Sequence, residues 1–116
     1  MKIKRIRDIS LEDVTDYDST GTTIQWIWSK KDNVPNFFLR RFVITPGNQI
    51  GLHNHAEEHE IFILEGEGLV FNDSGEKFNI KPEDTLFVHP HEPHGYKNTG
   101  PTNLVFLCII PRLKKD

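Results

Sequence analysis

Residues 47–66 read GNQIGLHNHAEEHEIFILEG and contain three of the six histidines of the chain. The second half of this stretch has isoleucine, phenylalanine and leucine at consecutive positions, which predicts a strand buried on both faces. His53 and His55 are two residues apart, so on an extended chain their side chains point to the same face. His59 opens the following strand with the same parity as Ile61. We therefore expect two neighbouring strands to direct three imidazoles at one spot.

Short apolar segments continue in both directions from this stretch, separated by the seven prolines and eight glycines of the chain. They are rich in Val, Ile, Phe, Thr and Trp and have the length of strands rather than helices. The sequence Asn72-Asp-Ser-Gly75 is a hairpin turn signal, and residues 11–18 are the only segment in which we expect a short helical turn. The pattern predicts an all-β fold, as a double-sheet barrel or sandwich. The expected strands are residues 23–29, 36–45, 49–53, 59–65, 68–72, 77–80, 85–89, 94–98 and 103–110.

The other three histidines, His89, His91 and His94, form a second cluster. His94 follows a proline and opens another expected strand, so it can join the first three at the same place. Divalent transition metals readily accept neutral imidazole, and ring nitrogens gathered on an inward face are costly when they lack partners. The alternative is a set of exposed loop histidines, or of core histidines bonded to the backbone. The grouping favours a metal site, because composition alone would scatter the six residues.

Length, charge and apolar runs exclude several classes of protein. A chain of 116 residues has the size of one domain, and its one cysteine, Cys108, cannot form an internal disulfide. The formal net charge of -3 gives no basic surface for nucleic acid or an anionic membrane. Residues 104–111, the longest apolar run, are far short of the ~20 residues of a membrane helix, and the basic N-terminus lacks the apolar part of a secretory signal. We expect a cytoplasmic protein with neither nucleic acid nor a membrane as partner.

The spacing within residues 47–66 resembles the first motif of the cupin superfamily. That motif runs Gly, five residues, His-x-His, three or four residues, Glu, six residues, Gly. The corresponding positions here are Gly47, His53, His55, His59 and Gly66. His59 therefore stands in place of the ligand carboxylate of cupins. Glu60 is one residue late and has the opposite strand parity, so His59 rather than Glu60 is expected as the ligand.

The second cupin motif runs Gly, five residues, Pro, x, Gly, two residues, His, three residues, Asn. The corresponding positions here are Glu83, His89, His91, His94 and Asn98. His94 and Asn98 match the motif, whereas the proline and both glycines are replaced. Taken together, residues 35–111 resemble the small, single-domain, manganese-binding cupins that use four histidines.

The resemblance implies a jelly-roll β-sandwich, the double-stranded β-helix of cupins, which is commonly a homodimer. We expect one domain over residues 1–116, with N-terminal strands or an arm in residues 1–30 and the barrel in residues 35–111. Manganese is the first expected ion and iron the second, while zinc, nickel and copper remain alternatives because nitrogen ligands bind them more tightly. A structural zinc with a closed tetrahedral shell is the rival interpretation. The metal ligands that the resemblance implies are His53, His55, His59 and His94.

Beside the metal we expect a mostly apolar pocket with three candidate catalytic or pocket residues, Arg40, Phe106 and Cys108. Phe106 and Cys108 share the inward face of the last expected strand, and Arg40 lies on an otherwise apolar strand face. Arg40 is either a rim residue whose charge reaches solvent or an anchor for an anionic substrate. Cys108 is either a small buried hydrophobe or an oxidisable thiol near a redox metal. His89 and His91 fall on a loop, where they face solvent or move protons at the barrel mouth.

Four neutral imidazoles leave the charge of a divalent ion uncompensated, which favours anionic oxygen ligands. We therefore expect a metal-dependent, dioxygenase-like oxidoreductase that acts on a small, partly apolar or anionic molecule with O2 or peroxide. Two alternatives stay open. One is a binding or sensor module that holds a small ligand without turnover, and the other is an isomerase or decarboxylase that uses the metal as a Lewis acid. Because imidazole binds a metal only when neutral, we expect metal loss below about pH 6. Tyr96 is expected to serve packing rather than acid catalysis.

Overall fold

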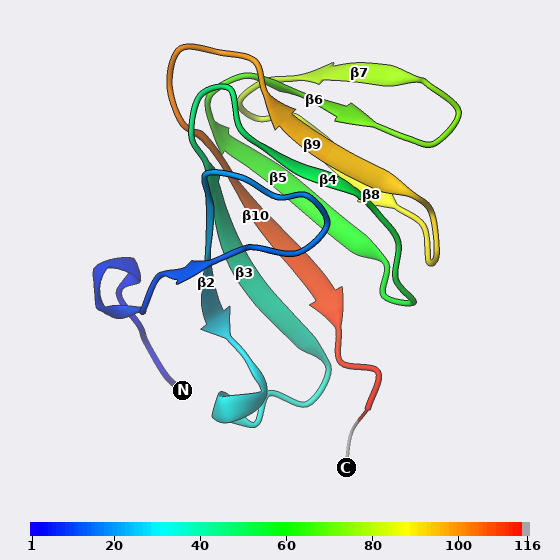
Figure 1. Cartoon of the computed structure of the whole chain (residues 1–116). Helices are drawn as coiled ribbons and strands as arrows, with labels where there is room; N and C mark the ends of the chain where they lie inside the picture. Colours follow the sequence, from blue (N-terminus) through cyan, green and yellow to red (C-terminus); the bar gives the residue numbers. More distant parts are fainter. Residues whose placement is uncertain (115–116) are drawn as a thin grey trace.

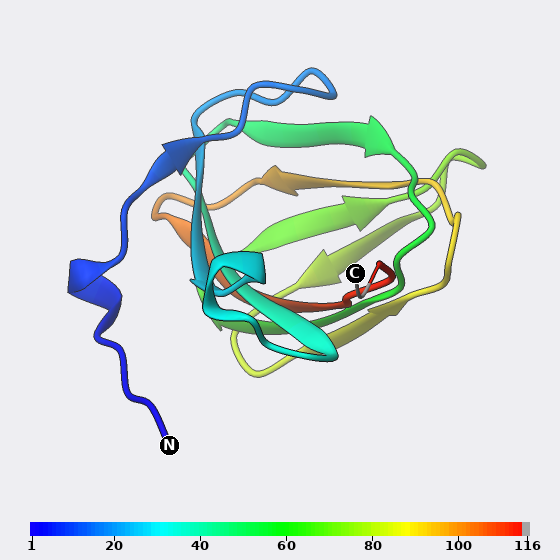
Figure 2. The ribbon, with the colours of Figure 1, turned by 90° about the horizontal axis from the view of Figure 1, so that it is seen from below.

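The computed structural model describes residues 1–114, which form ten strands and two short 3₁₀ turns. The strands make two antiparallel sheets that face each other as a sandwich (Figures 1 and 2). The larger sheet has the strand order β1-β2-β3-β10-β5-β8, and the smaller sheet has the order β4-β9-β6-β7. The strand bounds are β1 Glu12–Asp13, β2 Thr22–Trp28, β3 Phe37–Ile44, β4 Gln49–His53, β5 His59–Glu65, β6 Gly68–Phe71, β7 Lys77–Ile80, β8 Thr85–Val88, β9 His94–Asn98 and β10 Leu104–Pro111.

Strands β2 to β10 confirm the nine expected segments to within one residue at each end. The predicted all-β jelly-roll sandwich is confirmed as well. Both results have the same cause: β-branched and aromatic side chains favour the pleated strand, and glycine and proline end each run.

Residues 11–18 do not form the helical turn that we expected there. They contain β1, which pairs with the edge strand β2, and beyond it the N–H of Val14 donates to the carbonyl oxygen of Thr22 at 3.0 Å. A segment beside a sheet edge satisfies its backbone groups on that edge rather than within a helix. The 3₁₀ turns lie instead at Ile6–Asp8 (η1) and Lys30–Asp32 (η2). No helix in residues 1–114 is long and apolar enough to cross a membrane.

The core lies between the two sheets and consists of their inward side chains. In β5 the alternation is clear, because Ile61 and Ile63 are buried while Phe62 is 41% exposed. Strand β10 runs between β3 and β5, so its inward residues Phe106 and Cys108 are almost fully buried. The sequence predicted burial on both faces of β5, but the outer side chains of Phe62, and of Phe87 and Ile109 on the neighbouring strands, are exposed in the single chain, because the second sheet covers only the inner face.

The turns of both sequence motifs have a left-handed backbone. Gly47 and Gly66 have φ angles of 79° and 82°, a region that glycine adopts without a steric penalty. Glu83 and His91 stand where the second motif has glycine, and their φ angles are 74° and 63°. The N–H of His91 donates to the carbonyl oxygen of His55 at 2.7 Å, which helps to hold that turn in place. The replaced glycine positions therefore keep the left-handed conformation.

Asn98 ties the loop after β9 to the opposite sheet. Its side chain is fully buried, and Nδ2 donates to the carbonyl oxygens of Ile44 and Thr102 at 2.7 and 2.8 Å. Its Oδ1 accepts the N–H of Gly100 at 2.9 Å. Because three backbone groups are satisfied by one amide, the end of β9 is fixed relative to β3.

The N-terminal segment packs on the larger sheet and then crosses to the smaller one (Figure 2). Nε2 of Gln25 in β2 donates to the carbonyl oxygens of Ile6 and Ile9, each at 3.0 Å. Further along, the N–H of Thr20 donates to the carbonyl oxygen of Gln49 in β4 at 2.9 Å. The residues between these two attachments are thereby held across one side of the sandwich.

Candidate metal centre

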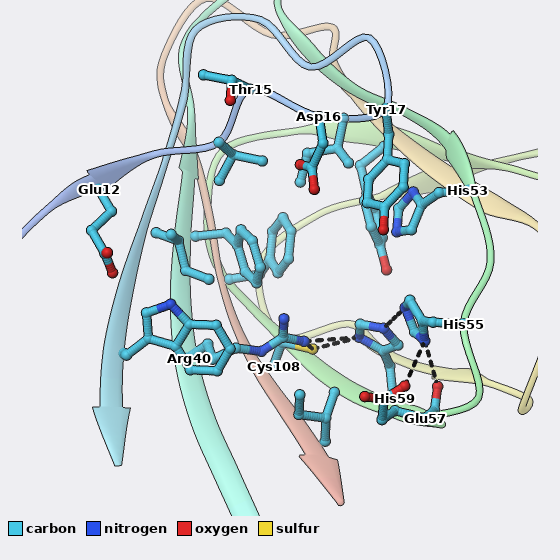
Figure 3. Close-up of a pocket in the computed structure, with 18 of the residues that line it drawn as sticks. Glu12, Thr15, Asp16, Tyr17, Arg40, His53, His55, Glu57, His59 and Cys108 are labelled. Carbon is cyan, nitrogen blue, oxygen red and sulfur yellow. Dashed lines mark hydrogen bonds and ion pairs between the residues drawn. The ribbon is translucent and has the colours of Figure 1, made fainter. Parts of the chain in front are cut away.

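A cavity of about 520 Å³ lies between the sheets and is lined on one side by residues 12–17 of the N-terminal segment (Figure 3). Its other walls come from β2, β3, β4, β5, β9 and β10. All three candidate pocket residues from the sequence line this cavity, as do three of the four candidate metal ligands. They are Arg40, Phe106, Cys108, His53, His55 and His59.

Strand pairing brings the two histidine clusters together. His53 ends β4 and His94 begins β9, and their Cα atoms are partners in the antiparallel ladder. His55 lies in the loop after β4, and His59 begins β5. The ligand nitrogens of His53, His55 and His94 all lie within 4.8 Å of one another. Residues far apart in the sequence thus place three imidazoles at one point.

The backbone fixes the orientation of these three rings. Nδ1 of His53, His55 and His94 lies 2.7, 2.7 and 2.8 Å from a backbone carbonyl oxygen. Because a carbonyl only accepts, each Nδ1 carries the ring proton and each Nε2 keeps a lone pair. In the described part of the chain, Nε2 of His94 is buried and has no hydrogen-bond partner. The accepting carbonyls belong to Gly51, Glu57 and Glu92, respectively.

His59 is held by side chains instead. Its Nε2 lies 2.5 Å from Nε2 of His55, and its Nδ1 lies 2.7 Å from Sγ of Cys108 and 3.3 Å from Nη2 of Arg40. Arg40 also donates to Sγ of Cys108 at 2.9 Å. Because a guanidinium can only donate, these contacts make Nδ1 of His59 an acceptor and put its ring proton on Nε2, facing His55. His59 therefore joins the cluster through its contact with His55.

Burial lowers the pKa of three of these imidazoles and so favours their neutral form. Desolvation lowers the pKa of His59 to about 2, assisted by the positive charge of Arg40, and lowers the pKa of His94 to about 4. Desolvation also lowers the pKa of His53. The neutral ring is the form that binds a metal. Burial raises the pKa of the Cys108 thiol against the opposing charge of Arg40, so the thiol stays protonated at neutral pH.

The donor set suits a divalent transition metal. Neutral imidazole nitrogen is the ligand that manganese, iron, nickel, copper and zinc share. A ligating histidine usually gives its other N–H to a carbonyl or carboxylate, as His53, His55 and His94 do. The buried Nε2 of His94, without a partner in residues 1–114, is the atom that a metal would satisfy.

The rest of the cavity wall is largely aromatic. The rings of Phe42 and Phe106 stack at 5.2 Å between centroids, and the ring of Tyr96 lies 5.1 Å from that of Phe106. Cζ of Arg40 lies 5.0 Å from the ring of Phe42 and 5.4 Å from that of Trp26. Arg40 is only 9% exposed, so its charge lies within the wall, supported by aromatic faces, rather than in solvent.

Residues 12–17 belong to the cavity wall, which sequence reasoning missed. The ring of Tyr17 stacks on that of His53 with centroids 4.5 Å apart and planes inclined by 13°. A Cβ atom on Gly51 would lie 2.0 Å from the carbonyl oxygen of Tyr17, so the close approach requires glycine. Gly51 was a usable signal, because glycine inside a strand marks the close approach of another backbone.

His89 and His91 lie apart from the cluster. Both are exposed, and neither lines the cavity. The ring of His89 packs edge-on against Phe87 with centroids 4.7 Å apart. His91 supports the centre through its backbone, because its N–H donates to the carbonyl oxygen of His55 and holds the loop that carries His55.

Comparison with known proteins identifies relatives of this chain. The model of the cupin domain family matches residues 40–110, more than half of the chain. An "Oxalate-binding protein" of Thermotoga maritima is 46% identical over 71 residues, which cover 60% of this chain and 58% of that protein. The chain thus aligns with less than two thirds of the length of this curated relative.

Two solved structures share the fold of this chain over nearly its whole length. The polyketide cyclase RemF from Streptomyces resistomycificus has a TM-score of 0.88 at 28% identity, over 96% of this chain and 79% of that one. A predicted oxalate decarboxylase from Thermotoga maritima has a TM-score of 0.84 at 30% identity, over 97% of this chain and 100% of that one. With the family match over residues 40–110, these likenesses show that the chain belongs to the cupin family.

Proposed function

We propose that the chain is a metal-dependent cupin that binds a small organic molecule through an oxygen atom at a four-histidine centre. The observation that carries the proposal is the cluster of three ligand nitrogens, those of His53, His55 and His94, within 4.8 Å of one another, with the opposite ring nitrogens held by backbone carbonyls. His59 completes the set when its ring proton moves from Nε2 to Nδ1, where Sγ of Cys108 at 2.7 Å is the acceptor. The proposed ligands are His53, His55, His59 and His94.

Manganese is our first choice of ion and iron the second. Zinc, nickel and copper bind nitrogen ligands more tightly in free competition, so metal supply decides which ion is bound. The adjoining cavity of about 520 Å³ leaves room for substrate beside the cluster. This room favours an ion with open coordination positions over a structural zinc with a closed shell.

A divalent ion at this point stabilises negative charge on an oxygen atom of a bound ligand. The residues of the chain orient that ligand. Arg40 contributes a buried positive charge to the same cavity, and Phe42 and Phe106 keep water from its apolar part. Asp16 and Glu57 are carboxylates in the cavity wall that can accept a proton.

We favour a reaction or binding event that depends on charge stabilisation alone. This chemistry serves decarboxylases, isomerases and binding proteins alike, and the relatives include an oxalate-binding protein and a polyketide cyclase. An oxygen-dependent oxidation is the second candidate, because four neutral ligands leave an ion cationic enough to attract anionic forms of oxygen.

Elemental analysis of protein purified without chelator tests the proposal. We expect one equivalent of a divalent transition metal per chain and its loss in the variant His55→Ala. Wild-type protein that takes up no ion, even after incubation with manganese, iron or zinc, would refute the metal site. Incubation of the loaded protein with enolisable acids with and without oxygen separates the two chemistries, since only the oxidation requires oxygen.

We also propose that two copies of the chain pair through the outer face of the larger sheet. An apolar groove on this face is lined by residues of β3, β5, β8 and β10, and Phe62 and Phe87 are 41% and 46% exposed there. Contiguous apolar surface of this kind marks interaction sites. Sedimentation should give a dimer for the wild type and a monomer for Phe87→Glu. A monomeric wild type would contradict the pairing.

A further inference from the structure

We propose that Tyr96 binds the substrate directly, donating its hydroxyl to the substrate oxygen that enters the histidine cluster. The proposal includes a substrate class: a monoanion or enolisable carbonyl compound with a flat apolar body, rather than a compact dianion such as oxalate. It rests on the proposed function, because it requires a ligand oxygen at the cluster.

The hydroxyl of Tyr96 has an unusual environment. The residue is 3% exposed, and among residues 1–114 its Oη has no hydrogen-bond partner. A buried hydroxyl without a partner is unfavourable, and phenylalanine would fill the same space without that penalty. A ligand that accepts a hydrogen bond accounts for tyrosine at this position.

The place of Tyr96 on β9 directs it to the metal centre. Tyr96 and His94 are two residues apart on one strand, so both side chains point to the same face. Their ring centroids are 5.6 Å apart, and Tyr96 lines the same cavity as His53 and His55. Nε2 of His94 and Oη of Tyr96 are thus buried polar atoms on the same face of β9, and in the described part of the chain both lack partners. One substrate oxygen at the cluster has Tyr96 as a donor beside it.

The size of the cavity argues against a two-carbon ligand. Its volume of about 520 Å³ falls within the range of about 300–1,000 Å³ found for pockets that hold drug-sized molecules. Oxalate would leave most of this space empty. The walls beyond the histidines are apolar and include Ile24, Trp26, Phe42, Phe106 and Ile110. Such walls suit a flat ring or alkenyl body.

The charges around the cavity argue against a dianion. Arg40 is the single lysine or arginine among the lining residues, and its Nη2 is already engaged with Cys108 and His59. Figure 3 shows Asp16 extending into the cavity from the N-terminal segment, opposite the guanidinium. A second negative charge on the ligand would face carboxylates instead of a cation. The lining carboxylates are Glu12, Asp13, Asp16 and Glu57.

Calorimetry with three probes tests the substrate class on protein that carries one equivalent of Zn²⁺. Benzoylacetone is enolisable and aromatic, acetylacetone has the same oxygen atoms without the ring, and oxalate is the compact dianion. We expect benzoylacetone to bind at least about tenfold more tightly than either, because its ring is buried in the apolar part. Zinc content measured after each titration shows that the ion stayed in the protein. If oxalate binds as tightly as benzoylacetone, the proposed substrate class is wrong.

The variant Tyr96→Phe tests the hydroxyl. We expect about tenfold weaker binding of benzoylacetone, the loss of one buried hydrogen bond, with unchanged zinc content and no decrease in Tm. Ser19→Ala is the matched control, since Oγ of Ser19 is also buried without a partner in residues 1–114 but does not line the cavity. Its affinity should equal that of the wild type. Equal affinities of Tyr96→Phe and wild type overturn the role of Tyr96.

The outcomes separate this inference from the proposed function. Protein that retains zinc and binds the probes, but does not respond to Tyr96→Phe, refutes the inference and leaves the metal site standing. Protein that neither retains zinc nor binds any probe refutes the proposed function, and the inference with it.

Discussion

The two sides of the candidate centre hold their histidines by different means. On the side of β4 and β9, Nδ1 of His53, His55 and His94 donates to backbone carbonyls of nearby residues. On the side of β5, the ring of His59 contacts the side chains of Cys108 on β10 and Arg40 on β3. The backbone-held rings depend only on the local path of the chain. The ring of His59, in contrast, is held only when β3, β5 and β10 are paired in the correct register.

This difference sets the proton positions. The three backbone-held rings already present an Nε2 lone pair, as a metal ligand requires. The contact with Arg40 at 3.3 Å instead favours a lone pair on Nδ1 of His59, with the proton on Nε2. His59 must shift that proton to bind a metal, so it should be the ligand most sensitive to its neighbours.

Loss of a backbone-held ligand should have the largest effect. His94→Ala is expected to weaken metal binding by about 100-fold or more, because it removes a ligand itself rather than a supporting group. Competition with a chelator of known affinity measures the change. His89→Ala is the control, since His89 is exposed and does not line the cavity. Equal losses in the two variants would mean that the second cluster is wrongly assigned.

Displacement of the backbone on the β4 side should come next. In Gly51→Ala the new Cβ would lie 2.0 Å from the carbonyl oxygen of Tyr17, which pushes the N-terminal segment from the carbonyl that holds His53. We expect a decrease of about 2–3 kcal/mol in the free energy of unfolding, measured in urea. Gly100→Ala should change it little, as its nearest neighbour would be at 3.4 Å. Similar stabilities for the two variants would contradict the close contact.

The pH dependence of the metal-free protein tests the burial of the rings. The pKa of His94 is lowered to about 4 in the folded state, from about 6.5 in the unfolded chain. Between these two pH values the unfolded state therefore binds more protons than the folded state. The free energy of unfolding decreases by about 2 kcal/mol as the pH falls from about 6.5 to 4. The lowered pKa values of His53, His59 and His94 predict that protons displace a metal from these three rings at a lower pH than the value of about 6 expected from the sequence.

Urea unfolding between pH 7 and 4 measures this slope. Carboxylates also titrate in the range, so the informative quantity is the difference between wild type and His94→Asn, in which the slope should be shallower. Identical slopes would show that His94 titrates like an exposed histidine.

Changes on the β5 side should have the smallest effect. Cys108→Ala removes the group at 2.7 Å from Nδ1 of His59, and we expect about tenfold weaker metal binding, as for other partners of ligating histidines. Cys108→Ser, which keeps a donor and acceptor, should restore most of the affinity. In ¹⁵N spectra of the zinc-loaded protein, the His59 ring should carry its proton on Nδ1 in wild type and Cys108→Ser. If Cys108→Ala bound the metal as tightly as the wild type, the claim that His59 depends on its side-chain partner would be wrong.

The sequence predicted the strands well because their apolar residues are local signals. Residues 61–64 are four consecutive apolar residues, and turn residues end the run, so no tertiary information was needed to predict the strand. The candidate ligands were also visible, because spacings of two and four residues around a strand end constrain the geometry. The left-handed φ angles of Glu83 and His91 were not predictable from residue type, since non-glycine residues adopt them only where the surrounding fold holds them.

The contacts between distant strands could not be predicted from spacing. Cys108 and Arg40 are Cα partners across β10 and β3, and Cys108 pairs with Ile61 of β5 on its other side. This register brings the thiol and guanidinium to His59, and it depends on how the whole sheet closes. The stacking of Tyr17 on His53 likewise depends on the path of the N-terminal segment.

X-ray absorption spectroscopy of the protein loaded with one equivalent of manganese or zinc tests the central claim most directly. Imidazole rings give a characteristic multiple-scattering pattern that counts them. The account predicts four imidazole ligands in the wild type and three in His59→Ala, with oxygen ligands in the remaining positions and no sulfur. Three or fewer imidazoles in the wild type, or a sulfur ligand from Cys108, would contradict it.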